Sequence, residues 1–213
     1  AKRTSNLTQP QLVPGIEKAT RKDFPGGIPG YGTDALRFTF CALATTGRDV
    51  RFDLNRIDGY RNFCNKIWNA AKFVLTNTED FDPSLNASRS TIDLWISSKF
   101  SRAVEDCELA LDTYRFDMFA NAIYEFAWHE YCDWYLELIK PRLWDEHLSP
   151  EERSGSQRTL LEILESLLRL AHPVMPFITE TIWQQIVPRI SGDHETIMTQ
   201  SYPAAVDFTS DAS

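Results

Sequence analysis

Apolar residues recur along the middle and end of the chain at the three- and four-residue spacing of amphipathic helices. This pattern predicts five helical runs. They span Asp58–Thr76, Ser90–Leu111, Phe116–Lys140, Ser149–Ala171 and Pro176–Val187. The connections between them are short and no internal repeat is present. We therefore expect an all-α fold in which the helices form an antiparallel bundle.

Local signals indicate where several of these helices begin and end. Ser90 and Asp93 have the spacing of a capping box, and Ser149 precedes Pro150, which suits a first helical position. A proline inside a helix removes one backbone donor and crowds the preceding turn. We therefore expect the third helix to stop at Pro141.

The start of the chain has a different pattern. Residues 1–31 are rich in proline, glycine and threonine, and the stretch 25–30 can continue neither a helix nor a central strand. Thr33 is a good N-cap for a short helix that Gly47 can end. Residues 49–53 alternate polar and apolar types, as a short edge strand or an extended loop does.

These patterns divide the 213 residues into three parts. Residues 1–53 form a junction of loops and a short helix, and residues 54–190 form the helical domain. Residues 191–213 form a strand-like tail with a frayed end. A chain of this length is long enough to bury a substantial core.

Charge is unevenly distributed along the chain. The formal net charge of −8 argues at first against a nucleic-acid partner. Residues 1–78, however, hold 12 of the 22 Lys and Arg residues and 6 of the 30 Asp and Glu residues, a charge of +6, whereas residues 79–213 carry −14. This division predicts a polarised surface with one face able to meet a polyanion. An acidic protein with an uneven surface is the simpler alternative.

The first predicted helix of the bundle has the most informative polar face. On a wheel with about 100° per residue, one side holds an apolar core stripe of Tyr60, Cys64, Ile67, Ala71 and Val74. The other side, called the polar stripe below, consists of Arg61, Asn62, Asn65, Lys66, Asn69 and Lys72. Trp68 lies at its border, and Phe81 follows in the next loop.

The composition of the polar stripe is unusual for a solvated helix face. It contains three asparagines, which are poor helix formers, and three cations with no carboxylate between them. Lys and Arg neutralise phosphates, and asparagine bonds to base edges or ribose hydroxyls. Trp68 or Phe81 can stack on an unpaired base. The stripe therefore predicts RNA contact. In the structural alternative, the asparagines bond to neighbouring loops and the cations pair with carboxylates of the acidic remainder.

Two other segments hold residue types that are used in catalysis. Glu125, His129 and Asp133 have i, i+4 spacing, so a metal site is conceivable, but no second ligand cluster is evident and the aromatic surroundings favour core. His172, followed by Pro173, is expected to be a capping or turn residue. No nucleophile motif and no phosphate-binding glycine loop occurs. We expect no catalytic residue, no metal and no cofactor in this chain.

The cysteines and the hydropathy of the chain bear on its environment. The four cysteines, Cys41, Cys64, Cys107 and Cys132, lie far apart with no CxxC pair. This arrangement fits neither a zinc site nor a dense disulfide framework, and it favours a reducing, cytoplasmic compartment. No run approaches the roughly 20 apolar residues of a membrane span. We expect no membrane partner and a monomeric chain.

Several longer segments carry a family resemblance. They include residues 31–39 (YGTDALRFT), 47–53 (GRDVRFD), 61–70 (RNFCNKIWNA), 132–137 (CDWYLE) and 168–173 (LRLAHP). Together they resemble the valyl-tRNA synthetase family of the class I aminoacyl-tRNA synthetases. The resemblance covers about residues 16–203, which is nearly the whole chain.

The resemblance implies an anticodon-binding domain at about residues 54–187, preceded by a junction that meets the inner corner of the tRNA. It implies valine tRNA and a catalytic domain of the same polypeptide as partners, with ATP and Mg²⁺ used by that domain. Both ATP-site motifs of the class, His-Ile-Gly-His and Lys-Met-Ser-Lys-Ser, are absent from this sequence, as are the editing domain and the C-terminal coiled coil. We therefore expect a tRNA-binding region that does no chemistry alone. The alternatives are a helical scaffold that docks a protein and has no RNA role, and a metal-dependent enzyme.

Overall fold

The structure is a computed structural model that describes residues 9–27, 29–45, 47, 53–190 and 195–208. In these residues the secondary structure consists of helices joined by turns and extended loops, with no β-strand. The all-α class predicted from the apolar spacing is therefore confirmed. The chain divides into two compact units, residues 1–31 and 32–213.

The first unit contains a helix that the sequence pattern did not predict. After a 3₁₀ turn at Pro10–Leu12, α1 spans Val13–Asp23. Pro14 lies in its first turn, where a missing N–H costs nothing because that donor has no helical acceptor. None of its residues is buried. The proline, glycine and threonine content of residues 1–31 favoured loops, which explains why this helix was overlooked.

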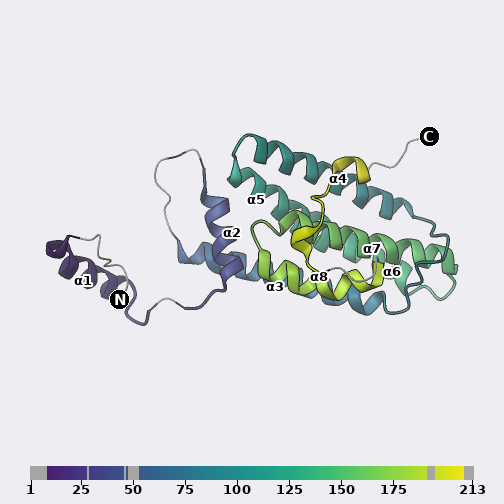
Figure 1. Cartoon of the computed structure of the whole chain (residues 1–213). Coiled ribbons are helices and arrows are strands. Elements are labelled where there is room, and N and C mark those ends of the chain that lie inside the picture. Colours follow the sequence, from purple (N-terminus) through teal and green to yellow (C-terminus); the bar gives the residue numbers. More distant parts are fainter. Residues whose placement is uncertain (1–8, 28, 46, 48–52, 191–194, 209–213) are drawn as a thin grey trace. The chain divides into compact units, whose positions relative to one another are not determined.

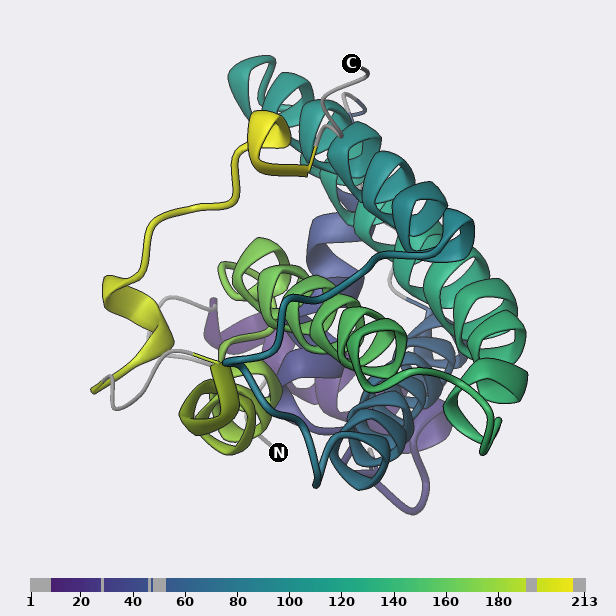
Figure 2. The ribbon, with the colours of Figure 1, turned by 90° about the vertical axis from the view of Figure 1, so that its right-hand side faces the viewer.

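The second unit is the predicted bundle. Its α-helices are α2 (Thr33–Leu43), α3 (Leu54–Asn77), α4 (Thr91–Asp112), α5 (Phe116–Glu125), α6 (Leu136–Leu143), α7 (Pro150–Ala171) and α8 (Pro176–Ile190). Figure 1 shows long helices that pack side by side. Their connections range from the short turn between α4 and α5 to the loop of residues 78–90 between α3 and α4, so the expectation of short connections holds only in part. Figure 2 shows α4 and the run from α5 to α6 along one side of the unit, beside α3, α7 and α8.

The packing places α7 at the centre of the bundle. It contacts α3, α4, α5, α6 and α8, and most of its residues are buried. α2 packs against α3 and α5, so the compact unit begins at Gly32. Gly155 of α7 lies against the loop before α4, where an added Cβ would be 2.0 Å from the carbonyl oxygen of Ser88. Only glycine permits this approach.

The compact unit that begins at Gly32 includes α2, which the sequence analysis placed in the junction of residues 1–53. The functional boundary between residues 53 and 54 stays a prediction.

The two helix starts predicted from cap residues are confirmed, whereas α3 begins at Leu54 and not at the predicted Asp58. Ser90 and Ser149 are N-caps, and each forms a capping box with the residue three positions later. Asp93, the partner of Ser90, is fully buried and does more than cap. Its carboxylate also accepts hydrogen bonds from Tyr135 Oη at 2.9 Å and Ser156 Oγ at 3.2 Å. One cap residue therefore ties α4 to two other parts of the bundle.

The third predicted helix differs from the prediction in two ways. It runs from Phe116 to Leu143, so the expected end at Pro141 is wrong. Pro141 lies in the last turn of α6, where a proline removes only one backbone hydrogen bond. The middle section, Phe126–Tyr135, is π-helical and is labelled η2. Its i→i+5 bonds change which residues face the core, which a wheel of constant angle does not capture.

The predicted limits of α2 are also wrong. Its N-cap is Gly32, with a φ of 91°, and Thr33 is the first helical residue. Glycine adopts this left-handed backbone without steric cost. The helix ends at Leu43 rather than at Gly47. The predicted strand or loop at residues 49–53 falls almost wholly outside the described residues.

The C-terminal tail is not strand-like where it is described. Residues 195–208 contain 3₁₀ turns at Ile197–Thr199 and Ala205–Phe208, joined by an extended stretch. The carbonyl of Ala205 accepts from Ser101 Oγ of α4 at 2.9 Å. Because such partners are side chains on helices rather than a second strand, no ladder forms. Residues 209–213, at the end of the tail that was predicted to fray, lie outside the described residues.

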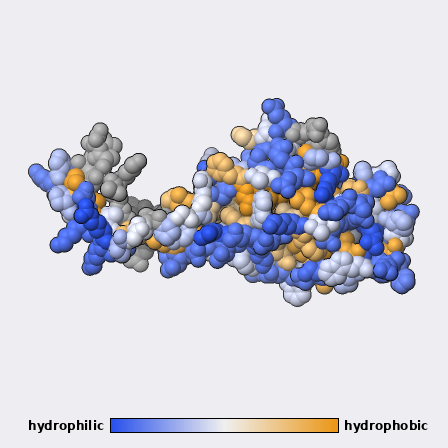
Figure 3. Space-filling view, turned by 90° about the horizontal axis from the view of Figure 1, so that it is seen from below, coloured by the Kyte–Doolittle hydropathy of each residue, from blue (hydrophilic) through white to orange (hydrophobic). Residues whose placement is uncertain are grey.

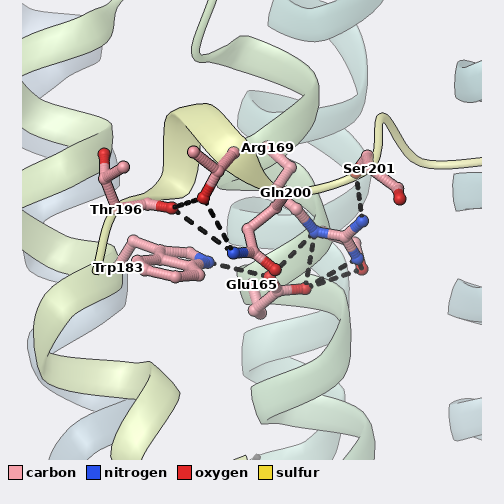
Figure 4. Close-up of polar contacts among 8 residues, drawn as sticks. Glu165, Arg169, Trp183, Thr196, Gln200 and Ser201 are labelled. Atoms are coloured by element: carbon pink, nitrogen blue, oxygen red, sulfur yellow. Dashed lines mark hydrogen bonds and ion pairs between the residues drawn. The ribbon is translucent and has the colours of Figure 1, made fainter. Parts of the chain in front are cut away.

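A polar network attaches this tail to α7 and α8. Figure 4 shows Glu165 and Arg169 of α7 pointing toward Trp183 of α8 and toward the tail. Trp183 Nε1 donates to Glu165 Oε1 at 2.8 Å, and Arg169 Nε pairs with the same carboxylate. Arg169 Nη1 also donates to the carbonyl of Ser201 at 2.7 Å. An ion pair with two further partners thus fixes the path of the tail.

Candidate nucleic-acid interface

The polar stripe lies on α3, the longest uninterrupted α-helix among the described residues. Asp53 caps its start, because its carboxylate accepts from the backbone N–H of Asn55 at 2.9 Å. α3 packs against α2, α7, α8 and η2. These neighbours cover one side of the helix and leave the other to solvent.

The buried side of α3 is wider than the predicted core stripe. The last three members of that stripe are buried and the first two are half-buried. Phe63 and Ala70, which the wheel left out, are buried as well. The ring centroid of Phe63 lies 5.1 Å from that of Phe38 in α2 and 4.9 Å from that of Tyr124 in α5. Neighbours on several sides therefore widen the apolar face.

Most of the polar stripe points to solvent. Four of its side chains, Arg61, Asn62, Asn65 and Asn69, are exposed and form no hydrogen bond or ion pair with any described residue. Lys72 is exposed too, with its Nζ 6.0 Å from the centroid of the Trp68 ring. Within the described chain, the asparagines therefore do not bond to neighbouring loops, and the structural alternative fails for them.

Lys66 is the exception in the stripe. Its Nζ forms an ion pair with the carboxylate of Asp133 in η2 and lies 4.0 Å from the centroid of the Trp128 ring. Only 24% of its side chain is exposed. For Lys66 the structural alternative therefore holds: the cation is paired with a carboxylate from residues 79–213, the acidic part of the chain. A phosphate contact by Lys66 would first have to displace Asp133.

The two candidate stacking residues are partly covered. Trp68 and Phe81 are both half-buried and pack against the core. The guanidinium of Arg158 lies 5.8 Å from the centroid of the Phe81 ring. Only the exposed part of each ring remains for a base. The roles of all eight candidate residues in RNA binding stay predictions.

The described geometry gives this surface a definite size and order. With about 1.5 Å of rise per residue, the eleven steps from Arg61 to Lys72 span roughly 16 Å, the length of a few nucleotides. A cation stands at each end of the stripe, and exposed asparagines lie between them. Such a surface can hold a short single-stranded stretch by its phosphates and by polar groups of its bases or riboses.

The aromatic segment of η2 is only partly core. Tyr131 and Tyr135 are fully buried, as expected, but Trp134 is exposed and His129 is half-exposed. The imidazole lies between Glu125 at 3.8 Å and Asp133 at 3.4 Å. In the described residues, no group of three or more His, Cys, Asp or Glu side chains has a geometry that holds a metal ion.

His172 takes the structural role that was predicted for it. It is the C-cap of α7, and its Nδ1 lies 2.7 Å from Thr179 Oγ1. Partial burial of the ring lowers the pKa of His172, although the charges of Glu180 and Asp34 oppose this shift.

No described helix is both long and apolar enough to cross a bilayer.

All four cysteines are free thiols. Burial raises the pKa of Cys41 and Cys64 to about 11, and that of Cys107 and Cys132 to about 12. Because the thiolate is the nucleophilic form, none of these side chains is activated at neutral pH.

Two acidic residues that position elements near the stripe were missed. Asp133 restrains Lys66, as described above. The carboxylate of Asp34 accepts from the backbone N–H groups of Phe177 at 3.3 Å and Ile178 at 2.7 Å, and so holds the start of α8 beside α2. These partners lie 67 or more positions apart in the sequence, and no local pattern indicates them.

Comparison with known proteins gives this surface a context. The family model for the anticodon-binding domain of tRNA ligases matches residues 93–212. The valine–tRNA ligases of Coxiella burnetii and Legionella pneumophila are both 54% identical to the chain over 95% of its length. The chain spans 22% of the length of these two relatives.

A solved structure shares the fold. The LeuRS of Agrobacterium radiobacter K84, in a ternary complex with tRNA and LeuAMS, matches 99% of this chain and 22% of its own, with a TM-score of 0.59 and 17% identity. α3 lies before the part that the family model matches, but within the part that the valine–tRNA ligases match. The family model covers more than half of the sequence, and the chain therefore belongs to the anticodon-binding domain family of tRNA ligases.

Proposed function

We propose that the chain binds valine tRNA through the exposed face of α3, as the RNA-reading part of a valine–tRNA ligase. The observation that carries this proposal is that five of the six side chains of the polar stripe point to solvent. Family membership supports a tRNA as the ligand, and the 54% identity to valine–tRNA ligases supports valine tRNA.

We assign different roles to the residues of the polar stripe according to their exposure and ion pairing. Arg61 and Lys72 contact phosphates, because both are exposed and neither is paired with a described carboxylate. The asparagines between them bond to bases or riboses. Lys66 stays paired with Asp133 and fixes α3 to η2 instead.

The remaining steps of aminoacylation belong to other parts of the proposed ligase. A catalytic domain of the same polypeptide would supply the chemistry with ATP and Mg²⁺, and this chain would position the tRNA for it. The chain alone should show no valine-dependent ATP–pyrophosphate exchange, since its sequence has neither ATP-site motif. A monomeric state and a cytoplasmic location are parts of the same proposal.

Single charge reversals test the RNA surface. Arg61→Glu and Lys72→Glu should each lower the affinity for valine tRNA about tenfold and reduce the salt slope by about 0.7, the value for one contact to a single strand. Lys66→Met should change the affinity less than threefold. Filter binding over a salt series, with folding checked by circular dichroism, measures both quantities.

Arg102→Glu is the matched control, because it changes the charge by the same amount at an exposed arginine of α4 that has no ion-pair partner in the described chain. It should leave the affinity within twofold. Equal losses in all three reversal variants would mean that the tRNA responds to net charge alone, and the assignment to α3 would be wrong.

A further inference from the structure

The turn between α4 and α5 presents a group of exposed apolar side chains. They are Leu109, Tyr114, Phe116 and Met118, with exposed fractions of 62%, 79%, 42% and 50%. We call them the tip patch. Contiguous apolar patches on the surface of soluble proteins often mark binding sites. This turn lies at the end of the bundle where α2 packs against α5 (Figure 1).

The backbone of Tyr114 is an independent sign of such a role. Its φ is 55°, the only positive value at a non-glycine residue of the described chain. The N–H of Tyr114 donates to Leu111 and that of Arg115 to Ala110, at 3.0 and 2.7 Å, which is the Schellman pattern. Glycine is the usual residue at this position because L side chains are strained there. Here a tyrosine accepts the strain although its side chain is 79% exposed, and this exposure leaves the ring available to a partner.

The charge around the patch indicates the kind of partner. Residues 105–118 contain five carboxylates and one cation, a net charge of −4. The cation, Arg115, is bound to Asp117 by two hydrogen bonds of 2.9 and 2.8 Å. The other four carboxylates are exposed and have no ion-pair partner in the described chain. Such a surface repels a polyanion and attracts a basic partner.

A groove beside the patch indicates the shape of the partner. A hollow of about 1190 Å³ lies between α4 and α5 and includes Leu109 and Met118 of the patch. Ala103, Ala110 and Ala122 also line it. The charged residues of the lining are three cations, Lys99, Arg102 and Arg115, and four carboxylates, Asp106, Asp117, Glu125 and Glu130; Lys99 is paired with Glu130 and Arg115 with Asp117. Small side chains let a backbone approach closely, and a groove between two helices suits a third helix laid along it. Figure 3 shows another face of the chain, where hydrophilic residues predominate and hydrophobic areas are scattered.

We propose that the tip patch and this groove dock an amphipathic helix of a protein partner whose polar side is basic. The apolar side of that helix covers Leu109 and Met118, and Tyr114 and Phe116 close over its end. Its cations face the unpaired carboxylates of residues 105–112. A second copy of the chain does not fit this role, because its tip carries the same negative charge. This proposal does not depend on the RNA-binding role of α3.

A synthetic peptide tests the proposal on the full chain. The probe is a fluorescein-labelled helix of about 18 residues with leucine at the i, i+3, i+4 and i+7 positions and lysine on its other face. Fluorescence anisotropy should show binding, and the same peptide with glutamate for lysine should not bind. Leu109→Ser with Met118→Ser should weaken binding at least tenfold, and so should Glu108→Lys with Asp112→Lys.

Matched controls use exposed residues elsewhere. Leu138→Ser with Trp144→Ser removes two other exposed apolar side chains, and Glu79→Lys with Glu146→Lys reverses two other exposed carboxylates. Both should bind the probe as the parent chain does, and circular dichroism confirms that all variants fold. Equal losses in patch and control variants would overturn the proposal.

Two further outcomes would also overturn it. The first is a loss of tRNA affinity in the Leu109→Ser, Met118→Ser variant as large as that in Lys72→Glu, because the tip would then be an RNA surface. The second is a dimer in light scattering that the same variant converts to a monomer, because the patch would then be a contact between copies.

Discussion

The exposed face of α3 and the α4–α5 tip are two surfaces of one bundle with opposite character. The polar stripe has cations and asparagines that face solvent, whereas the tip patch has apolar side chains surrounded by carboxylates. Each lies over the same apolar core. The difference teaches that the core sets the positions of the helices, and that the exposed side chains alone decide whether a surface suits a polyanion or a basic protein.

The two surfaces also differ in how they relate to the stability of the fold. At the border of the polar stripe, Trp68 packs partly against the core, so a candidate contact residue also supports the bundle. At the tip, Tyr114 holds a disfavoured backbone conformation and is mostly exposed. Changes at the stripe should therefore cost stability more often than changes at the tip.

The largest expected effect is on tRNA affinity, which should depend on the polar stripe and not on the tip patch. Arg61→Glu combined with Lys72→Glu should weaken valine tRNA binding about 100-fold, because two contacts are lost and repulsion is added. Leu109→Ser with Met118→Ser should leave that affinity within twofold. Filter binding at one fixed salt concentration measures both. The comparison breaks down if the tip variant loses affinity as well.

The next effect is on stability at the stripe. Trp68→Ala should lower the free energy of unfolding by about 2–3 kcal/mol, somewhat less than for a fully buried tryptophan, because the ring is half-buried. Urea denaturation followed by circular dichroism measures it. An unchanged midpoint would show that the ring contributes nothing to the core and is wholly available to RNA.

The effect at the tip should have the opposite sign. Tyr114→Gly removes the left-handed strain and should raise stability by about 1 kcal/mol, or Tm by roughly 2–4 °C. The same change should weaken binding of the basic helical probe, since it deletes one aromatic side chain of the patch. A rise in stability with no change in probe binding would leave the strain of Tyr114 without a function.

The smallest effect concerns the turn between α7 and α8. Burial lowers the pKa of His172, so the unfolded chain binds a proton more readily than the folded one. Its contribution is complete above the unfolded pKa of about 6.5 and is lost as the pH falls toward the lower folded value. Because the ring is partly exposed, the fall in Tm should be less than about 3 °C. Differential scanning calorimetry should show a smaller fall in His172→Gln.

Local sequence signals predicted the parts of this fold that local interactions determine. The capping boxes at Ser90 and Ser149 set the starts of α4 and α7. The asparagines and cations of the polar stripe are exposed, as the wheel indicated, apart from Lys66. These features depend on residues within a few positions of one another, where spacing alone carries the information.

The features that were missed depend on residues far apart in the chain. The pairing of Lys66 with Asp133 joins residues 67 positions apart, and the bond from Ile178 N to Asp34 joins residues 144 positions apart. The π-helical register of η2 and the wide buried face of α3 likewise follow from tertiary packing. Such contacts leave no periodic signal in the sequence, so only the structure reveals that Lys66 has a partner.

The tail bears on the order in which the bundle assembles. The α4–α5 and α7–α8 pairs join neighbours in sequence, but the bond from Ser101 to Ala205 spans 104 positions and the Phe100 and Phe208 rings meet at 4.7 Å. Contacts of such long range form late, after the local pairs have closed. During synthesis, α4 therefore stays without this attachment until residue 208 has left the ribosome. Pulsed hydrogen exchange should accordingly show protection in α4 and α5 before the tail is fixed.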